Sequence, residues 1–443
     1  MNEETKEDGR VQQVSSLEII EKIRRGERVE YENADITGDL CLDQCDLPKD
    51  ENGKAVVISE ISIKKSTVDG DINFSEGFFC NQFNISGTTI KGDAYFSGTR
   101  FNREALFIDS HFNESASFAG THFKNRAIFR SARFVKSVSF CGAEFKLQAR
   151  FDHSIFSMET AFEATRFEFA FFNGAKFCGR ADFQGSNFER NAEFSKSIFE
   201  KNASFIRALF QENAKFIDAE FRSDLHFDGA LFNGEADFSR SQFDKTAFFN
   251  ADTHFKKEAK LDEVKGSRLR FEARFDDSLS EQLSLKNSDI SFIFAPWDSI
   301  KNHLAYHGSA YLALIRSYNN QEYFEDADNC LFQYRVKKRK DLSLMRKAAD
   351  YIICCFLGYG VRPQYPLFLG LGVIIFSSFI YWSGNQASSY KFEPILLSLA
   401  IFFSQTGMDE LTGLYKGISI IESAFGVLII ACFFVSLAKW TLR

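Results

Sequence analysis

The 443-residue chain has little proline, tryptophan and histidine, and a small net charge for its size. Five prolines and 27 glycines exclude a proline-rich linker protein and a collagen, so any repeat must be packed rather than extended. The net charge of −7 comes from 53 Lys and Arg against 60 Asp and Glu. Phosphate binding needs a dominant basic stripe, and we therefore expect no nucleic-acid partner.

The nine cysteines do not form a pattern typical of disulfides or metal sites. They are odd in number and scattered, with no C-x-x-C pair and no clustered histidines. We expect free thiols in a reducing compartment, no metal and no cofactor. Residues 1–10 are acidic and polar and lack the apolar core of a secretory signal peptide. Because no Ser/His/Asp, Cys/His or phosphate-cradling arrangement stands out, the sequence predicts a protein that is not an enzyme.

The chain is rich in phenylalanine, with 53 residues against 13 tyrosines and 3 tryptophans. From Phe96 to Phe162 the phenylalanines are alternately five and six residues apart, and after a run of fives through Phe177 the alternation resumes up to Phe249. Neither a helix, with a period of about 3.6, nor a strand, with a period of about 2, explains this spacing. A small residue, usually alanine, stands two positions before most of these phenylalanines.

This repeat, A-x-F-x-x with an extra residue in every second copy, predicts a solenoid over residues 33–295. Each short side would send one Phe and one small side chain inward, with polar residues outside. Four sides make a coil of about 22 residues, and coils stack about 4.8 Å apart as in any β ladder. The span then predicts about 12 coils and a rod of roughly 55 to 60 Å.

These residues resemble the pentapeptide-repeat family in its Phe-rich variant. The resemblance implies a right-handed quadrilateral β-helix. Some members of that family resemble B-form DNA, which requires a strongly acidic surface. Here residues 96–255 carry 20 Lys and Arg against 21 Asp and Glu, which disfavours that function. Before the array, within residues 1–32, Ser15 and Glu18 open a short amphipathic pattern that predicts a helix capping the first coil.

The phenylalanine period ends near Pro296, and residues 296–350 read as a cytoplasmic helical linker. This segment contains a basic run whose members are Arg335, Lys337, Lys338, Arg339 and Lys340. One interpretation is a solvated helix pair stabilised by charges three and four residues apart. The other is a juxtamembrane collar that faces anionic lipid.

Residues 351–443 are predicted to form a membrane domain. Uncharged or nearly uncharged stretches at 366–382 and 418–438 predict two transmembrane helices, and residues 351–360 an interfacial helix. Basic residues crowd before the first helix and follow the second, so the positive-inside rule puts both termini and the β-helix in the cytoplasm. We therefore expect a multi-pass protein of the inner, plasma membrane.

Residues 392–411 are too apolar for an exposed loop and too short to span twice, which predicts a re-entrant half-helix. The order of outer helix, half-helix, polar loop and inner helix resembles a two-transmembrane potassium-channel pore, as found fused to pentapeptide repeats in other bacterial proteins. Glu422 and Gly426 match an acid and a bending glycine of the inner helix. The resemblance implies a homotetramer. We expect Glu422 to support the half-helix rather than to contact ions.

The filter is where the sequence departs from that family. The motif T-x-G-[YF]-G-D aligns with Gln405, Thr406, Gly407, Met408, Asp409 and Glu410. The first glycine is kept, but Asp409 replaces the second, so strict potassium selectivity is not expected. Four copies of Asp409 and Glu410 would form an acidic ring that attracts monovalent cations. The alternative is an inert turn at the membrane surface.

Two functions therefore remain open. The first is a cation-channel-like membrane protein with a cytoplasmic β-helix. The second is a membrane-anchored scaffold whose β-helix binds a protein partner and conducts no ions.

Overall fold

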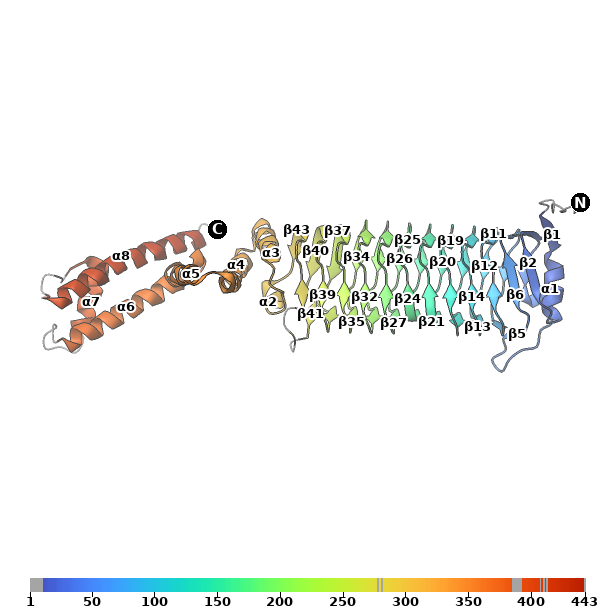
Figure 1. The fold of residues 1–443 in the computed structure, drawn as a ribbon, viewed down its shortest axis with the longest axis horizontal. Helices are drawn as coiled ribbons and strands as arrows, with labels where there is room; N and C mark the ends of the chain where they lie inside the picture. The colour runs from blue at the N-terminus through green and yellow to red at the C-terminus, as the bar shows by residue number, and fades with distance from the viewer. Residues whose placement is uncertain are drawn as a thin grey trace, which may run out of the picture. The chain divides into compact units, whose positions relative to one another are not determined.

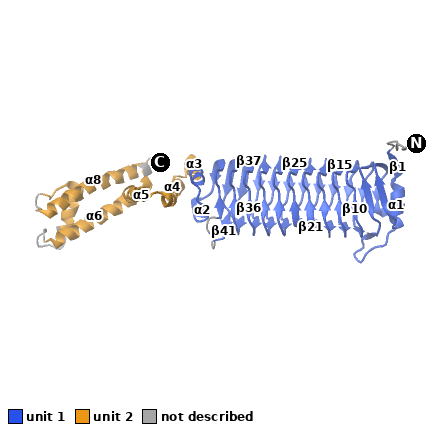
Figure 2. Cartoon of the chain, viewed as in Figure 1, with its two compact units in different colours: residues 1–313 blue, residues 314–443 orange. Residues whose placement is uncertain are grey.

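The chain folds into two compact units, residues 1–313 and residues 314–443 (Figure 2). The computed structural model describes residues 11–276, 279, 282–384, 393–406, 408, 411 and 413–441. The first unit is a stack of short parallel strands and the second is helical (Figure 1). The predicted β-solenoid is confirmed, with about 13 turns against the 12 expected.

Most strands of the first unit are two or three residues long. Some longer ones join two sides of a turn, as where Glu144–Arg150 pairs with both His122–Phe123 and Ala127–Ile128 of the preceding turn. The strands of four or more residues are β1 (Gln12–Ser15), β2 (Val29–Glu32), β3 (Ala34–Thr37), β6 (Ile61–Lys64), β21 (Glu144–Arg150), β24 (Arg166–Phe171), β37 (Gln242–Phe249), β40 (Lys265–Phe271) and β43 (Asp289–Phe294). They belong to two parallel sheets of 22 and 21 strands, in which each strand pairs with strands one turn away.

The register between turns follows the phenylalanine spacing. Strand β11 (Thr89–Ile90) pairs with β15 (His111–Phe112) of the next turn, so that Ile90 lies beside Phe112. Where the sequence has its run of fives, β22 (Ile155–Phe156) pairs with β25 (Lys176–Phe177), and this turn is shorter by a single residue. The first turn has the usual length, since Gln12 pairs with Ala34, but the next turn is longer, since Leu40 pairs with Ile72. The chain makes a 3-10 turn at Leu42–Gln44 within this insertion.

Stacked phenylalanine rings fill the axis of the solenoid. Phe140 lies parallel to Phe162 of the next turn, with ring centroids 4.8 Å apart and planes 5° from parallel. Across the axis it meets Phe151 edge to face, at 5.2 Å and 82°. Both contacts are favourable geometries for aromatic rings, and both rings are fully buried. Each phenylalanine is therefore held by rings above, below and beside it.

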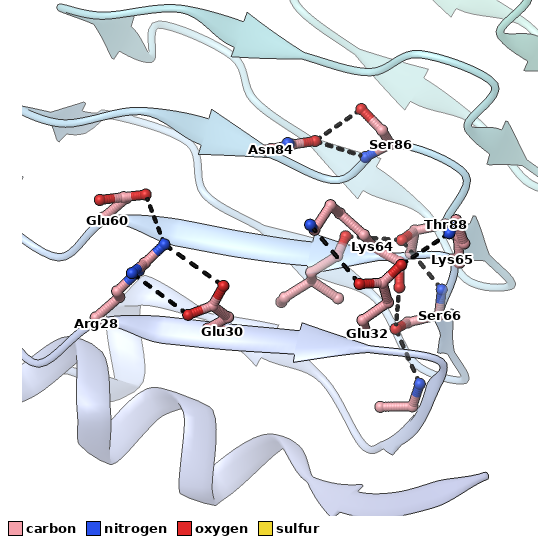
Figure 3. Close-up of polar contacts among 12 residues, drawn as sticks. Arg28, Glu30, Glu32, Glu60, Lys64, Lys65, Ser66, Asn84, Ser86 and Thr88 are labelled. Carbon is pink, nitrogen blue, oxygen red and sulfur yellow. Dashed lines mark hydrogen bonds and ion pairs between the residues drawn. The ribbon is translucent and has the colours of Figure 1, made fainter.

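The small residue two positions before each phenylalanine lies where neighbouring turns approach most closely. At several positions where this residue is Ser or Thr, its buried hydroxyl donates to a main-chain carbonyl of the preceding turn. Thr121 donates to the carbonyl of Phe96 at 2.7 Å, and Ser154 to that of Phe129 at 2.6 Å. In Figure 3, Thr88 donates in this way to the Ile63 carbonyl, whereas the Ser66 hydroxyl donates to the carbonyl of Lys64 in its own turn. These hydroxyls satisfy buried carbonyls without adding volume.

Charged side chains on the outer faces pair along the stack. Arg190 donates to Glu212, Lys215 to Glu193 and Arg240 to Asp218, in each case between neighbouring turns and at 2.8–2.9 Å. Exposed pairs of this kind stabilise proteins by less than about 1 kcal/mol each. These pairs place opposite charges next to each other on neighbouring turns. Together with the near balance of acidic and basic residues over 96–255, this disfavours the strongly acidic surface that DNA mimicry needs.

Both ends of the solenoid are covered. Helix α1 (Ser16–Arg24) begins after Ser15, whose hydroxyl accepts from the amide of Leu17 at 3.3 Å, and it buries Ile19, Ile20 and Ile23 on the first turn. The Glu18 carboxylate accepts from the Tyr31 hydroxyl at 2.6 Å. At the other end, α2 (Trp297–Ile300) and the following residues bury Trp297, Ile300 and Leu304. Open strand edges are thereby protected from pairing with another chain.

The second unit is a bundle of helices. Helix α3 (Gly308–Asn320) runs across the division between the units and α4 (Phe324–Lys338) follows. The remaining elements are η2 (Arg339–Asp341), α5 (Leu344–Leu357), η3 (Gly358–Gly360), α6 (Gln364–Ser383), α7 (Glu393–Ser404) and α8 (Leu414–Thr441). Helices α6, α7 and α8 pack against one another in all three pairs.

The stack of inward-facing phenylalanine rings can be tested with two adjacent phenylalanines, one of which faces inward and the other outward. Phe172 is fully buried, whereas Phe171 points outward, half-buried, with the Arg150 guanidinium 5.0 Å from its ring centre. We expect Phe172→Ala to lower the free energy of unfolding by about 3–5 kcal/mol, because it opens a cavity in the ring stack. Phe171→Ala should cost no more than about 1 kcal/mol. Guanidinium titration of the full chain in mild detergent, followed by circular dichroism, measures both; equal losses would contradict the ladder.

Candidate functional site

Two helices of the second unit are long and apolar enough to cross a membrane, at Gln364–Ser383 and Leu414–Ala438. The helix between them in sequence, α7, has 12 residues and is about 18 Å long. A spanning helix needs about 20 residues, so α7 can reach only partway through a bilayer. The candidate site is the region where α7 packs between α6 and α8.

Two apolar clusters hold α7 in place. In the first, Phe402 of α7 is buried between Ile374 of α6 and Ile429 of α8. In the second, Ile401 packs with Tyr381 of α6 and with Leu411. Helix α7 therefore buries one side along its length, and its position is determined by packing on both long helices.

Glu422, one of the predicted inner-helix residues, lies at the junction of all three helices. Only 2% of its surface is exposed. Its carboxylate accepts a hydrogen bond from the Tyr381 hydroxyl of α6 at 2.7 Å and one from the Ser398 hydroxyl of α7. A buried carboxylate needs such donors, and here they join α8 to both neighbours.

Gly426, the other predicted inner-helix residue, lies at a close contact between backbones. A Cβ atom built on it would stand 2.4 Å from the carbonyl oxygen of Phe402. Helix α8 runs through this position without interruption. Gly426 thus lets the C-terminal end of α7 touch α8, and in this structure it serves packing and not a bend.

The predicted filter residues follow the end of α7. Gln405 has a positive φ of 57°, a backbone conformation that commonly ends helices, and Gln405 and Thr406 are both exposed. Met408 is half-buried and packs against the cluster of Tyr381, Ile401 and Leu411. Three further predicted filter positions, Gly407, Asp409 and Glu410, lie outside the described residues.

The predicted basic collar divides into two kinds of residue. Arg335, Lys338 and Lys340 are exposed, and Lys337 is half-buried. Arg339 instead donates to the Asp350 carboxylate at 2.6 Å and to the Tyr359 hydroxyl, and its guanidinium lies 3.9 Å from the ring centre of Tyr351. Arg339 is therefore engaged inside the unit, Lys338 donates to the Tyr334 hydroxyl at 3.3 Å, and Arg335 and Lys340 are exposed at the surface of the unit.

The Arg339 cluster has a distinct charge state. Burial alone would raise the pKa of Asp350, but hydrogen bonds from Tyr359 and Arg339 outweigh burial and hold this pKa below its ordinary value of 3.8. Burial and the neighbouring carboxylate raise the pKa of Tyr359 to about 12. At neutral pH the cluster therefore contains an ionised Asp350, a charged Arg339 and a neutral Tyr359.

Helix α5 exposes large apolar side chains. Leu344 and Met345 are each 85% exposed, and Ile352 and Tyr351 are more than half exposed. The sequence prediction placed an interfacial helix at residues 351–360, whereas the helix of the structure runs over Leu344–Leu357 and ends at Gly358 in the left-handed conformation. The predicted helix therefore starts seven residues later than the helix of the structure, and Arg346 and Lys347, which the sequence prediction connected with a basic collar, lie in its first turn.

The sequence did not predict the hydrogen-bond partners of Glu422 and Arg339. Ser398 and Tyr381 bind Glu422, and Asp350 and Tyr359 bind Arg339. A signal was present for the first pair, because a hydroxyl within an otherwise apolar membrane helix commonly bonds a neighbouring helix. For the second pair, the distance along the chain from Arg339 to Tyr359 gave no indication of contact.

Gly426 provides a direct test of the contact between α7 and α8. Gly426→Ala should lower the stability of the helical unit by about 1–3 kcal/mol, because the new methyl group displaces the Phe402 carbonyl. Gly417, on the same helix, has open space at its Cβ position, and Gly417→Ala should leave stability unchanged or raise it by up to about 1 kcal/mol. Thermal unfolding of both variants in detergent measures these changes. Equal melting temperatures for Gly426→Ala and Gly417→Ala would contradict the close contact between α7 and α8.

The cluster of Arg339, Asp350 and Tyr359 predicts that the stability of the helical unit depends on pH. Because the pKa of Asp350 is lower in the folded protein, its ionised form stabilises the fold at pH values above about 3.8, and this contribution is lost as the pH falls further. Asp350→Asn should remove this acid-dependent component and, at neutral pH, cost of the order of 3 kcal/mol by leaving Arg339 unpaired. Melting curves from about pH 7 to pH 3 measure the effect, with exposed Asp341→Asn as the control. If the melting temperature of Asp350→Asn falls with acid as much as that of the parent protein, the prediction is refuted.

Comparison with known protein families finds a match within the first unit. The sequence profile of a family described as pentapeptide repeats (9 copies) matches residues 96–144, 107–155 and 194–242. No curated protein and no solved structure matches the chain. The chain therefore contains a pentapeptide-repeat domain, and it carries two helices that could span a membrane.

Proposed function

We propose that four copies of this chain assemble a cation-conducting pore from α6, α7 and α8. The observation that carries the proposal is α7, an apolar helix too short to span, packed between two helices long enough to do so. One such set of three helices cannot enclose a path by itself, so conduction requires an oligomer. A tetramer follows from the resemblance to two-transmembrane potassium-channel pores.

The end of α7 supports a cation over an anion. The C-terminus of a helix carries a partial negative charge, and the exposed Gln405 and Thr406 follow directly. Four copies of Asp409 and Glu410 would add an acidic ring after them. Irregular backbone at membrane depth is tolerated where it lines a cavity, and a pore would supply that cavity. Since Asp409 takes the place of a filter glycine, we propose permeation by monovalent cations without strict potassium selectivity.

In this proposal Glu422 supports the pore and does not touch ions. Its hydrogen bonds to Ser398 and Tyr381 fix the depth and rotation of α7 between the two long helices. The membrane would be the inner, plasma membrane. The exposed basic residues Arg335, Lys338 and Lys340, before the first spanning helix, favour a cytoplasmic location for both termini and for the β-helix.

The β-helix would act as a sensor, a spacer or a docking surface for a protein. One observation favours the alternative function, a membrane-anchored scaffold without conduction. The outer side chains of the solenoid form ordered rows along two long parallel sheets, a regular surface of the kind that solenoid proteins use for binding. The two functions differ in whether ions cross the membrane.

Ion flux into liposomes containing the purified full chain tests the proposal. We expect passage of both potassium and sodium. The double variant Asp409→Asn, Glu410→Gln should reduce flux about tenfold or more, because an acidic ring concentrates cations at the pore. Asp341→Asn, which removes an exposed acid outside α6, α7 and α8, serves as the matched control and should conduct as the parent does.

Absence of flux from correctly inserted protein, or a particle that is monomeric in mild detergent, would refute the pore. If in addition the β-helix retains a specific protein partner, the scaffold function is supported.

A further inference from the structure

The last three strands of the 22-stranded sheet form a flat outer face near the C-terminal end of the solenoid. Strands β37, β40 and β43 have eight, seven and six residues, whereas most strands of the solenoid have two or three. They pair in register, and the residues between their outward positions, such as Leu269, are buried. Two columns of side chains therefore point outward across the three strands, and we call them the terminal face. The first column consists of Thr246, Arg268 and Phe292, and the second of Phe248, Arg270 and Phe294.

Arginine side chains over outward phenylalanine rings recur along the solenoid, and three of these arginines are already paired with an acid. The sets of arginine, ring and acid are Arg100 with Phe78 and Asp50, Arg150 with Phe171 and Asp152, and Arg270 with Phe294 and Glu272. The distances from guanidinium nitrogen to carboxylate oxygen are 3.9, 3.0 and 3.0 Å. In each set the ring orients a planar guanidinium, and a carboxylate takes its donors.

Arg268 has the ring but not the acid. Its guanidinium lies 6.0 Å from the ring centre of Phe292. Among the residues that the structure describes, Arg268 has no hydrogen bond and no ion pair. Its neighbour on the other side is the uncharged Thr246. Arg268 is exposed, and Phe292 is 44% exposed. A guanidinium in this state presents paired N–H donors that match a carboxylate, so Arg268 lacks the partner that the three other arginines have.

The charges around the terminal face favour a partner with a single carboxylate over a polyanion. Asp244 of β37 and Asp289 of β43 are exposed, and Glu272 holds Arg270. A nucleic acid needs a basic stripe that dominates its surroundings, and these acids would repel its phosphates. A protein segment can instead place one acid at Arg268 and an apolar side chain on the ring beside it.

The spacing of Arg268 and Phe292 suits two residues of one extended segment. Side chains two positions apart lie on the same side of an extended chain, about 7 Å from each other, close to the 6.0 Å between this guanidinium and ring. We propose that the terminal face binds an extended protein segment with an acidic and an aromatic residue two positions apart. The acid contacts Arg268 and the aromatic ring contacts Phe292. This inference rests on the docking role proposed for the β-helix and is independent of conduction.

Fluorescence anisotropy with the full chain in mild detergent tests the proposal. The probe is a dye-labelled peptide with blocked ends that carries Asp-Ser-Phe in a background of Gly and Ser. Two matched peptides carry Asn-Ser-Phe and Asp-Ser-Ala. We expect each of them to bind about tenfold more weakly than the probe, because each loses one of the two contacts.

Substitutions on the terminal face should remove these preferences one at a time. Arg268→Gln should abolish the preference for the Asp peptide over the Asn peptide. Its control is Arg133→Gln, which changes an exposed arginine of β19 that has no ion pair among the described residues. Phe292→Ala should abolish the preference for Phe over Ala in the peptide, whereas Phe171→Ala, which removes an outward ring elsewhere on the solenoid, should preserve it.

A charge reversal keeps the test independent of folding. Arg268→Glu should lose binding of the Asp-Ser-Phe peptide and gain binding of a Lys-Ser-Phe peptide, which the parent chain should bind at least about tenfold more weakly than the probe. A misfolded variant would show the loss but not the gain.

Three results would overturn the proposal: equal binding of the Asp and Asn peptides by the parent chain, unchanged binding by Arg268→Gln, or tighter binding of a single-stranded oligothymidylate through Arg268. The last result would assign the terminal face to a nucleic acid. Ion flux is a separate measurement. Peptide binding without flux would refute the pore and leave the terminal face standing, and flux without peptide binding would do the reverse.

Discussion

The spacing of parallel strands, about 4.8 Å, is the constraint on which the first unit depends. Aromatic rings stack favourably at the same distance, and the Phe140 and Phe162 rings are 4.8 Å apart. A phenylalanine at an inward position therefore packs against its equivalent in the next turn without any adjustment of the backbone. The small residue that precedes most rings, as at Ala149 and Ala170, both almost completely buried, takes little of the space inside the turn and leaves it to the rings.

The second unit solves a different problem, the placement of polar groups among apolar helices. Glu422 is expensive to bury alone, but with hydroxyl donors on α6 and α7 it becomes the group that fixes three helices relative to one another. Outside α6, α7 and α8, Arg339 has the same relation to Asp350 and Tyr359. In both places one largely buried polar side chain, through hydrogen bonds with fixed directions, joins separate elements of the helical unit.

The solenoid was predictable from the sequence because every turn repeats the same inward pattern, and dozens of copies determine the period. The additional turn and the insertion near the start of the solenoid were less visible in the sequence, since Ile and Leu replace Phe there and the insertion interrupts the period. In the helical unit, hydropathy predicted α6 and α8 to within a few residues. The contacts of Glu422, Gly426 and Arg339 were not predictable, because each depends on groups far away in the sequence that carry no periodic signal. Three of the filter positions fall outside the described residues, and their role stays a prediction.

The change of register near Phe167 has a consequence for how such a chain can vary. One turn there is shorter than its neighbours by a single residue, yet Phe156 still faces Phe177, and the turns that follow return to the usual length. The missing residue is absorbed at a single corner, so a local change in length is not passed on to later turns. Whole turns can then be added or removed without altering the end caps or the helices beyond them. The number of turns, and with it the length of the solenoid, can therefore change independently of the end caps.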